Sequence, residues 1–316
     1  PTYLSNMTEC WSILILPMAM AFAFGFYIKR KKLGYSIYGV MLFAFLVGVC
    51  INVYQEMNGN PRIDAMGIAQ DNGAMEGKEV RFGVFGTSLF ATATTDASCG
   101  AVNAMHDSLT PLGGMLVLFN MLLGEIIYGG VGSGLYGMIL FILLTVFIAG
   151  LMVGRTPEFL GHKVEAREMK IATMVVLMHP FLILVGTGIS AAVAAANPEI
   201  GWLNNPSFHG LSEMLYEYTS AAANNGSGFE GLSDNTPFWN IMTGIALIMG
   251  RYFPIVGQVA IAGLLASKKY VPESAGTLKT DTFTFSLMTF AVIIIVAALS
   301  FFPAQALGPI ADYLSF

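Results

Sequence analysis

The chain has 316 residues, of which 55% are hydrophobic and only 11% are charged, and its mean hydropathy is +0.67. Soluble domains carry about 25% charged residues, so this composition excludes an ordinary soluble protein and predicts an all-α integral membrane protein. The formal net charge is −5, and the sequence has no basic patches with interleaved aromatic residues, which argues against nucleic-acid binding.

Six apolar segments are long enough to cross a bilayer, which requires about 20 mainly apolar residues. They are residues 11–28, 35–54, 112–152, 171–196, 238–266 and 283–303. Basic residues cluster between alternate segments: four at 29–32, four at 155–170 and three at 268–279, or eleven of the 15 Lys and Arg. Cytoplasmic loops carry an excess of Lys and Arg. We therefore expect a multi-pass membrane protein with these clusters on the cytoplasmic side.

Three of the apolar stretches predict an unusual topology. Residues 84–97 and 211–223 are too short to cross the bilayer, so we expect both to be re-entrant pore helices. The run 112–152 is long enough for two crossings, but two would place the basic residues from 155 to 170 outside. It is therefore predicted to cross once, as a helix broken at 128–137, where glycines are frequent and helix formation is disfavoured.

The two re-entrant stretches belong to an internal repeat. When Gly100 is aligned with Gly226, a shift of 126 residues without a gap, residues 97–101 fall on 223–227 and Thr110-Pro111 falls on Thr236-Pro237. Each copy has three parts in the same order. A short apolar stretch is typical of a pore helix, the small polar run with glycine that follows is typical of an ion-coordinating loop, and the helix that starts at proline is typical of a membrane helix. Glycine allows the backbone conformations that direct carbonyl groups at a cation. The predicted filter residues are Ser98, Cys99, Gly100, Asn224, Asn225 and Gly226. The alternative is a pair of ordinary extracellular turns.

The broken helix and two intramembrane charges suggest a gate. Discontinuous helices in transporters usually line the ion path, so a flexible gate is predicted at Gly130, Gly132 and Gly134, although a close helix-packing motif is the alternative. Glu125 and Arg251 occupy equivalent positions in the two repeats. Charges inside a membrane usually pair or serve the pathway, so we expect Arg251 to neutralise or support the broken segment with Glu125 as its partner. A purely structural pair is the alternative.

Acidic residues lie near both predicted filter segments. Asp96 directly precedes the first segment, and the second has the neighbours Glu213, Glu217, Glu230 and Asp234. An acidic outer mouth would concentrate cations, whereas a solvated loop surface is the equally good alternative. The scattered cysteines and histidines predict no metal site, and the sequence has no Ser/His/Asp constellation or phosphate-binding loop. We therefore expect no catalytic site and no cofactor, with energy supplied by another chain.

Several long motifs resemble one known family. The sequence is similar throughout to the KdpA family, the potassium-binding subunits of the bacterial Kdp potassium-transporting ATPases, within the potassium transporter superfamily. The similarity is carried by MEGKEVRFG at 75–83, ASCGAV at 97–102, GGVGSGLYG at 129–137, GRTPE at 154–158, NNGS at 224–227 and LGPIADYLS at 307–315.

The resemblance implies a fold and a function. The family is built from four helix–pore loop–helix repeats around one pore, and this chain resembles the third and fourth, with further sequence expected upstream of Pro1. Residues 1–170 would form the third-repeat unit (pore loop 84–103, broken helix 112–152), 171–266 the fourth (pore loop 211–228), and 267–316 an extra helix. Gly100 and Gly226 would supply two of four filters for K⁺, and Arg251 would contact the broken helix.

The resemblance also implies partners. These are a P-type ATPase subunit that hydrolyses ATP and small accessory subunits, while this chain conducts K⁺ without a catalytic site of its own. At Asp96 the family usually has a small uncharged residue, so the electrostatics of the site differ here. The alternative functions are a Trk/Ktr-like channel or symporter subunit, and a non-conducting structural membrane subunit.

Overall fold

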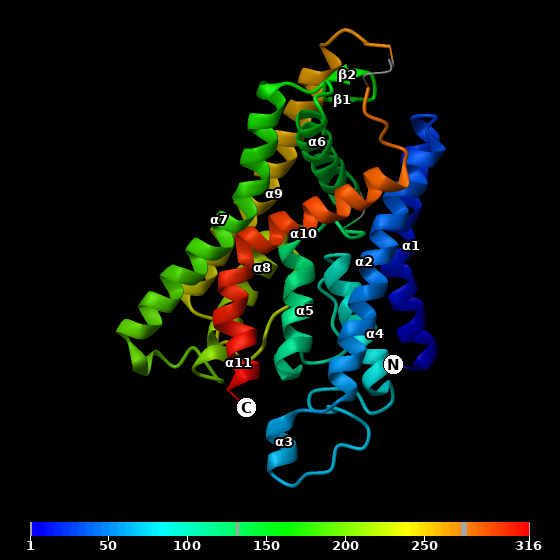
Figure 1. Ribbon diagram of the computed structural model, residues 1–316. Coiled ribbons are helices and arrows are strands. Elements are labelled where there is room, and N and C mark those ends of the chain that lie inside the picture. The colour runs from blue at the N-terminus through cyan, green and yellow to red at the C-terminus, as the bar shows by residue number, and fades with distance from the viewer. Residues whose placement is uncertain (1, 131–132, 273–276, 316) are drawn as a thin grey trace.

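The computed structural model describes residues 2–130, 133–272 and 277–315, and its architecture is almost entirely helical, as predicted (Figure 1). A single two-stranded antiparallel ribbon, in which Glu158 pairs with Lys163, is the only sheet in these residues. The elements in chain order are α1 (Tyr3–Tyr27), α2 (Lys31–Met57), α3 (Pro61–Ala65), α4 (Gly83–Asp96), the 3₁₀ turn η1 (His106–Ser108), α5 (Pro111–Leu122), α6 (Ser133–Val153), β1 (Glu158–Phe159), β2 (His162–Lys163), α7 (Ala166–Ala196), η2 (Pro198–Ile200), α8 (Phe208–Ala223), α9 (Pro237–Ala266), α10 (Phe283–Gln305), the π-helical turn η3 (Ala306–Ile310) and α11 (Ala311–Leu314).

Six helices of the described chain are long and apolar enough to cross a membrane, which agrees with the predicted number. The helices α4 and α8, by contrast, are short and deeply buried, as re-entrant pore helices must be when surrounded by protein. The protein is thus a multi-pass membrane protein.

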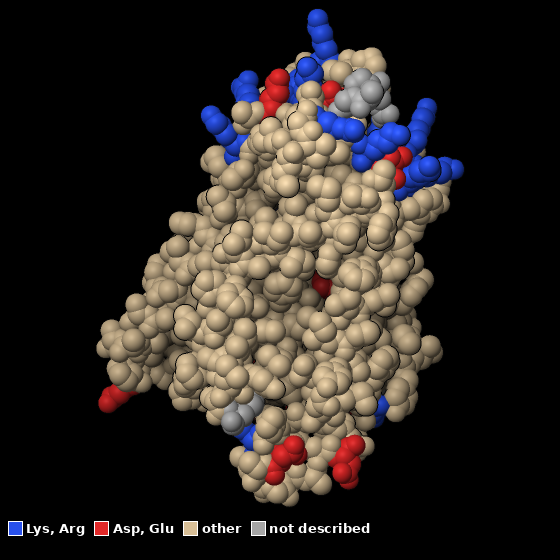
Figure 2. Space-filling model, in the orientation of Figure 1, with Lys and Arg blue, Asp and Glu red and all other residues tan. Residues whose placement is uncertain are grey.

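The charges on the surface separate the two ends of the molecule. In the orientation of Figure 2, Lys and Arg gather at the end formed by β1, β2 and the ends of α6 and α9, while acidic side chains predominate at the opposite end, near α3. Between them this face is almost uncharged. The basic clusters thus gather at one end of the molecule, as predicted.

Two helix–pore helix–helix units are packed side by side. In the first, α4 packs against α2 and α5; in the second, α8 packs between α7 and α9. The units meet where α5 contacts α8 and α6 contacts α7, and α10 packs obliquely across α2 and α6 (Figure 1).

The same local signals start the helix after each pore loop. Pro111 and Pro237 occupy the first turn, where the missing N–H is not needed. The preceding threonine caps each helix: Thr110 Oγ1 accepts a hydrogen bond from Gly113 N at 3.3 Å, and Thr236 Oγ1 accepts one from Trp239 N at 3.4 Å. The 126-residue repeat therefore extends to the capping geometry.

The repeat fails in the middle of the membrane. The helix α9 runs without interruption to Ala266, but its counterpart ends at Leu122 and resumes at Ser133. The predicted break is therefore present, but it begins before residue 128. The reason is a series of left-handed backbone conformations at Gly124, Glu125, Tyr128 and Gly129, with φ of 87°, 58°, 61° and 57°, which a right-handed helix cannot contain.

Candidate ion-conducting site

The first predicted filter segment has a defined conformation at the end of α4. Ser98 and Gly100 have φ of 50° and 85°, and between them Cys99 N donates a hydrogen bond to Thr94 O at 2.9 Å. Ser98 and Gly100 are half-buried, and Cys99 is exposed. Positive φ is freely available only to glycine, so the segment adopts a backbone that most sequences avoid.

The second segment adopts the same conformation at the end of α8. Asn224 and Gly226 have φ of 58° and 82°, and Asn225 N donates a hydrogen bond to Ser220 O at 3.2 Å. Every one of these features lies 126 residues after its counterpart. The alternative of two unrelated turns does not explain why two pore helices end in one unusual conformation.

The asparagine side chains of the second segment are held by the protein itself. Asn225 Oδ1 accepts hydrogen bonds from Ser220 Oγ at 2.8 Å and from Ser227 N and Oγ, both at 2.9 Å. Asn224 Nδ2 donates to the carbonyl groups of Ala221, Ala222 and Leu247. These two side chains brace the loop, which leaves its backbone carbonyl groups as the candidate ion ligands.

The two segments lie against each other. Ser98 Oγ donates a hydrogen bond to Ala223 O at 3.3 Å, which joins the first segment to the end of α8. On the other side of Asn225, its Nδ2 atom lies 2.9 Å from Met121 Sδ of α5. Met121 and Ser220 carry no sequence signal for this role, because it depends on contacts that form only in the folded chain.

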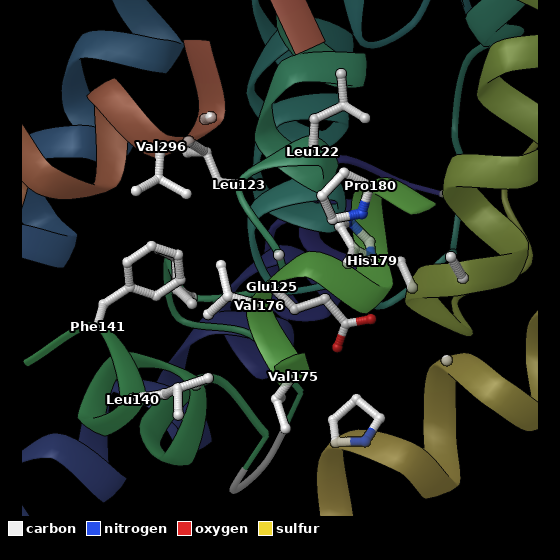
Figure 3. Close-up of a pocket in the computed structure, with 18 of the residues that line it drawn as sticks. Leu122, Leu123, Glu125, Leu140, Phe141, Val175, Val176, His179, Pro180 and Val296 are labelled. Carbon is white, nitrogen blue, oxygen red and sulfur yellow. The ribbon is translucent and has the colours of Figure 1, made fainter. Parts of the chain in front are cut away.

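A cavity of about 100 Å³ lies next to the end of α8, where the second filter segment begins (Figure 3). Figure 3 shows the Glu125 side chain extending into it among aliphatic and aromatic groups from α5, α6, α7 and α10. Ala222 and Ala223 from the end of α8, and Gly250 and Arg251 from α9, complete the part of the wall closest to the second segment. Glu125 and Arg251 thus both line this cavity.

The contacts of Glu125 and Arg251 connect the filter to the broken helix. Ser98 of the first filter segment and Arg251 of α9 both act on the Glu125 carboxylate, Arg251 by electrostatic attraction. Arg251 also acts on Tyr136 of α6. Among the described side chains Glu125 and Arg251 do not form a direct ion pair. Glu125 lies in the break itself and not within a helix, which differs from the position expected for it.

The three predicted gate glycines have different positions. Gly130 lies in the break, Gly134 lies in the first turn of α6, and Gly132 falls outside the described residues. A Cβ atom on Gly134 would overlap the backbone of Tyr128 and Gly129, so its glycine is explained by the close approach of the break to α6. Gly134 therefore supports the close-packing alternative at that position.

Asp96 lies behind the first filter segment. Its backbone oxygen accepts a hydrogen bond from Gly129 N at 3.2 Å, and its side chain is 3% exposed. Its Oδ2 atom has no hydrogen-bond partner among the described residues. Asp96 is thus placed between the pore helix and the break.

The acidic residues near the second segment do not form one solvated surface. Glu230 and Asp234 are exposed and Glu217 is half-buried, but Glu213 is completely buried. For Glu213 the expectation of a solvated loop is wrong, because Asn205 N and Nδ2 both donate to its Oε1 atom at 3.2 Å.

Known proteins share extensive sequence similarity with the chain. The family model described as "Potassium-transporting ATPase A subunit", KdpA, matches residues 1–314. Proteins named potassium-transporting ATPase potassium-binding subunit are 70% identical in Phocaeicola vulgatus, 68% in Bacteroides thetaiotaomicron and 58% in Flavobacterium psychrophilum. Each match covers 100% of this chain but 56% of the relative, so the chain spans little more than half the length of these relatives. The chain therefore belongs to the family of the potassium-transporting ATPase A subunit.

Proposed function

We propose that this chain binds K⁺ and forms part of its path across the cytoplasmic membrane, as the channel-like subunit of an ATP-driven uptake complex. The observation that carries the proposal is the repeated conformation of residues 98–100 and 224–226 at the ends of two buried pore helices. The names of the relatives supply the identity of the ion.

The proposed mechanism is selective binding followed by passage, without covalent chemistry. Backbone carbonyl groups of the two segments replace part of the hydration shell of K⁺. The helices α4 and α8 both end at these segments, so the negative ends of their dipoles favour a cation there. Beyond the segments the ion meets the cavity that contains Glu125 and Arg251, where the conformation of residues 123–130 regulates its onward movement.

The chain acts with partners in this proposal. Because it spans 56% of its relatives, two further filter segments come from the remaining part of the protein. ATP hydrolysis takes place in a P-type ATPase subunit, and small accessory subunits complete the assembly. The word ATPase in the names of the relatives supports an energy-coupled complex over a Trk/Ktr-like channel or symporter.

The proposal is tested by Rb⁺ binding, in competition with K⁺ and Na⁺, to the assembled complex that contains this chain. Wild type is compared with Gly100→Asp and Gly226→Asp, which place a bulky charged side chain in each segment. We expect Rb⁺ to be displaced by K⁺ but not by Na⁺, and binding to be lost in both variants.

Other outcomes identify the alternatives. Variants that bind Rb⁺ normally would show that the two segments are only packing elements, as in a non-conducting structural subunit. Selective flux that persists without the ATPase subunit would instead favour the Trk/Ktr-like function.

A further inference from the structure

A second polar cluster lies at the acidic end of the molecule, away from the filter. It joins three elements that are distant in the sequence: Asp107 of η1, His209 at the start of α8 and Asp312 of α11. His209 Nε2 lies 3.0 Å from Asp107 Oδ1, and His209 Nδ1 lies 3.0 Å from Asp312 Oδ2. The imidazole ring is thus held between two carboxyl groups, and its plane stacks on Phe229.

Glu213 adds a third carboxyl group, one helical turn after His209. Its side chain is 0% exposed, and its Oε2 atom has no hydrogen-bond partner among the described residues. A buried carboxylate oxygen without a partner is costly. Asn205 Nδ2 donates to both Glu213 Oε1 and Asp107 Oδ2, at 3.2 and 3.0 Å, so these two carboxyl groups face the same amide.

Gly231 packs closely against the two neighbouring carboxyl groups: a Cβ atom there would overlap Glu213 Oε1 and lie 2.6 Å from Asp107 Oδ2. One ligand atom from each of Asp107, His209 and Glu213 lies within 4.8 Å of the other two. In a tetrahedral zinc site, ligand atoms about 2.0–2.1 Å from the ion lie about 3.4 Å from one another, so side-chain rotations that shorten the longest of these separations bring all three atoms to one ion.

The geometry also provides the support that metal-binding histidines usually have. A ligating imidazole typically donates its other ring N–H group to a carboxylate, which fixes its orientation; here Asp312 is placed to accept from Nδ1. Arg62 lies 3.4 Å from Asp312 and orients that carboxyl group in turn. A site with one imidazole and two carboxyl groups suits Zn²⁺ and related transition metals, whereas Ca²⁺ and Mg²⁺ prefer oxygen ligands alone.

We propose that Asp107, His209 and Glu213 bind one divalent transition-metal ion of the Zn²⁺ class, with Asp312 positioning His209. Without the metal, both ring nitrogen atoms donate to carboxyl groups, so the imidazole carries two protons. The metal replaces the proton on Nε2, and this proton is released to solvent. The ion joins η1, which follows the first filter segment, to α8, the pore helix of the second, and so holds the two proposed filter segments in register at their outer side.

The test is ⁶⁵Zn²⁺ binding to the purified full-length complex, at constant pH and with Mg²⁺ in excess. Wild type is compared with His209→Gln, Glu213→Gln and Gly231→Ala; the last adds a methyl group beside the carboxyl pair without removing a ligand. His162→Gln, which changes a histidine of the β1–β2 ribbon at the other end of the molecule, is the matched control. Elution of the intact complex from a sizing column establishes that each variant is assembled.

We expect one Zn²⁺ per chain in wild type and in His162→Gln, with proton release measurable in a weak buffer, and at least tenfold weaker binding in the three cluster variants. With Co²⁺ as the probe, wild type should gain a visible absorption band that His209→Gln lacks. Wild type without a bound ion, or cluster variants that bind as tightly as wild type, would overturn the proposal. Rb⁺ binding to the wild-type complex is measured in parallel: selective Rb⁺ binding without bound Zn²⁺ would overturn this site and leave the proposed function intact, whereas bound Zn²⁺ without selective Rb⁺ binding would contradict the proposed function alone.

Discussion

Gly100 lies so close to the carbonyl oxygen of Asn225 that a Cβ atom on Gly100 would overlap it. The equivalent Gly226 has open space around the position of its Cβ atom. The two segments share one backbone conformation but not one environment: the first is packed against the second, whereas the second faces outward from the described chain. This asymmetry is expected for two neighbouring members of a larger ring.

The asymmetry predicts unequal effects of the same substitution. Gly100→Ala should displace the Asn225 carbonyl group and weaken Rb⁺ binding by at least about tenfold, or ~1.4 kcal/mol. Gly226→Ala meets no atom of this chain and should cost only the strain of a left-handed alanine, about 1–2 kcal/mol in the stability of the loop. Rb⁺ affinity and thermal unfolding of the two assembled variants provide the comparison. Equal losses of affinity would contradict this account.

Because Glu125 and Arg251 line the same cavity, we expect a substitution of Glu125 to compensate in part for a substitution of Arg251. Arg251→Gln removes the positive charge near Glu125, so a cation entering the cavity should be retained by the remaining carboxylate and K⁺ flux should fall. Glu125→Gln in the same chain removes that charge and should restore part of the flux. A double-mutant cycle on flux should give a coupling of about 0.5–3 kcal/mol. Additive effects would show that the two residues act independently.

We expect the buried ion pair between Lys78 and Glu56 to contribute strongly to the stability of the protein. Lys78 Nζ and Glu56 Oε2 lie 2.7 Å apart, with both side chains 0% exposed, and Glu56 Oε1 accepts from Thr110 N and Oγ1 at the start of α5. Lys78→Met leaves the carboxylate buried and unpaired, which should destabilise the protein by about 3–5 kcal/mol. Adding Glu56→Gln should recover much of this loss in thermal unfolding. A double variant no more stable than Lys78→Met would refute the explanation.

The ion pairs of Lys268 should stabilise the fold by an amount that does not change around neutral pH. It lies 2.7 Å from Glu168 and 2.9 Å from Glu165, so it joins the end of α9 to the start of α7. Burial alone would lower the pKa of Lys268, but hydrogen bonds and charge attraction from Glu168 and Glu165 raise it above its usual 10.5. A group with a raised pKa stabilises the fold below its unfolded-state pKa and loses this effect as the pH rises through the folded-state value.

The measurement is the difference in melting temperature between wild type and Lys268→Met. It should correspond to about 1–3 kcal/mol, stay constant from about pH 6 to about pH 9, and decrease only above the usual lysine pKa. Lys269→Met, on a neighbouring residue, is the control. A difference that decreases between neutral pH and pH 9 would mean that another group is responsible.

The fold was largely predictable because the membrane imposes simple rules. The lengths of the apolar segments and the distribution of Lys and Arg were sufficient to find six long helices, two re-entrant helices and the broken one. The boundaries were harder to predict: α7 begins at Ala166 and not at residue 171, and the break begins after Leu122. Tyr128 and Glu125 carry no sequence signal for left-handed conformations, which the packing around them imposes.

The filter segments were predictable from the sequence because they occur twice in it. The polar cluster around His209 occurs once and was not predictable. The repeat located Gly100 and Gly226 from one alignment, because the same backbone geometry requires the same residue type. Asp107, His209 and Asp312 are separated by about a hundred residues from one another, and nothing in the sequence indicates that they meet. Glu213 appeared to belong to a solvated surface because burial depends on the elements that cover it, here the segment around Gly231.

The bracing of Asn225 has a consequence for how ions are distinguished. One donor from Ser220 of α8 and two from Ser227 of the loop hold one amide oxygen, and the amide nitrogen is engaged by Met121. The side chain therefore has no freedom to swing toward a smaller ion and complete its coordination. In the proposed filter, Na⁺ is disfavoured because the second segment cannot contract around it, so discrimination between the two ions derives from the stiffness of the loop as well as from the chemistry of its oxygen atoms.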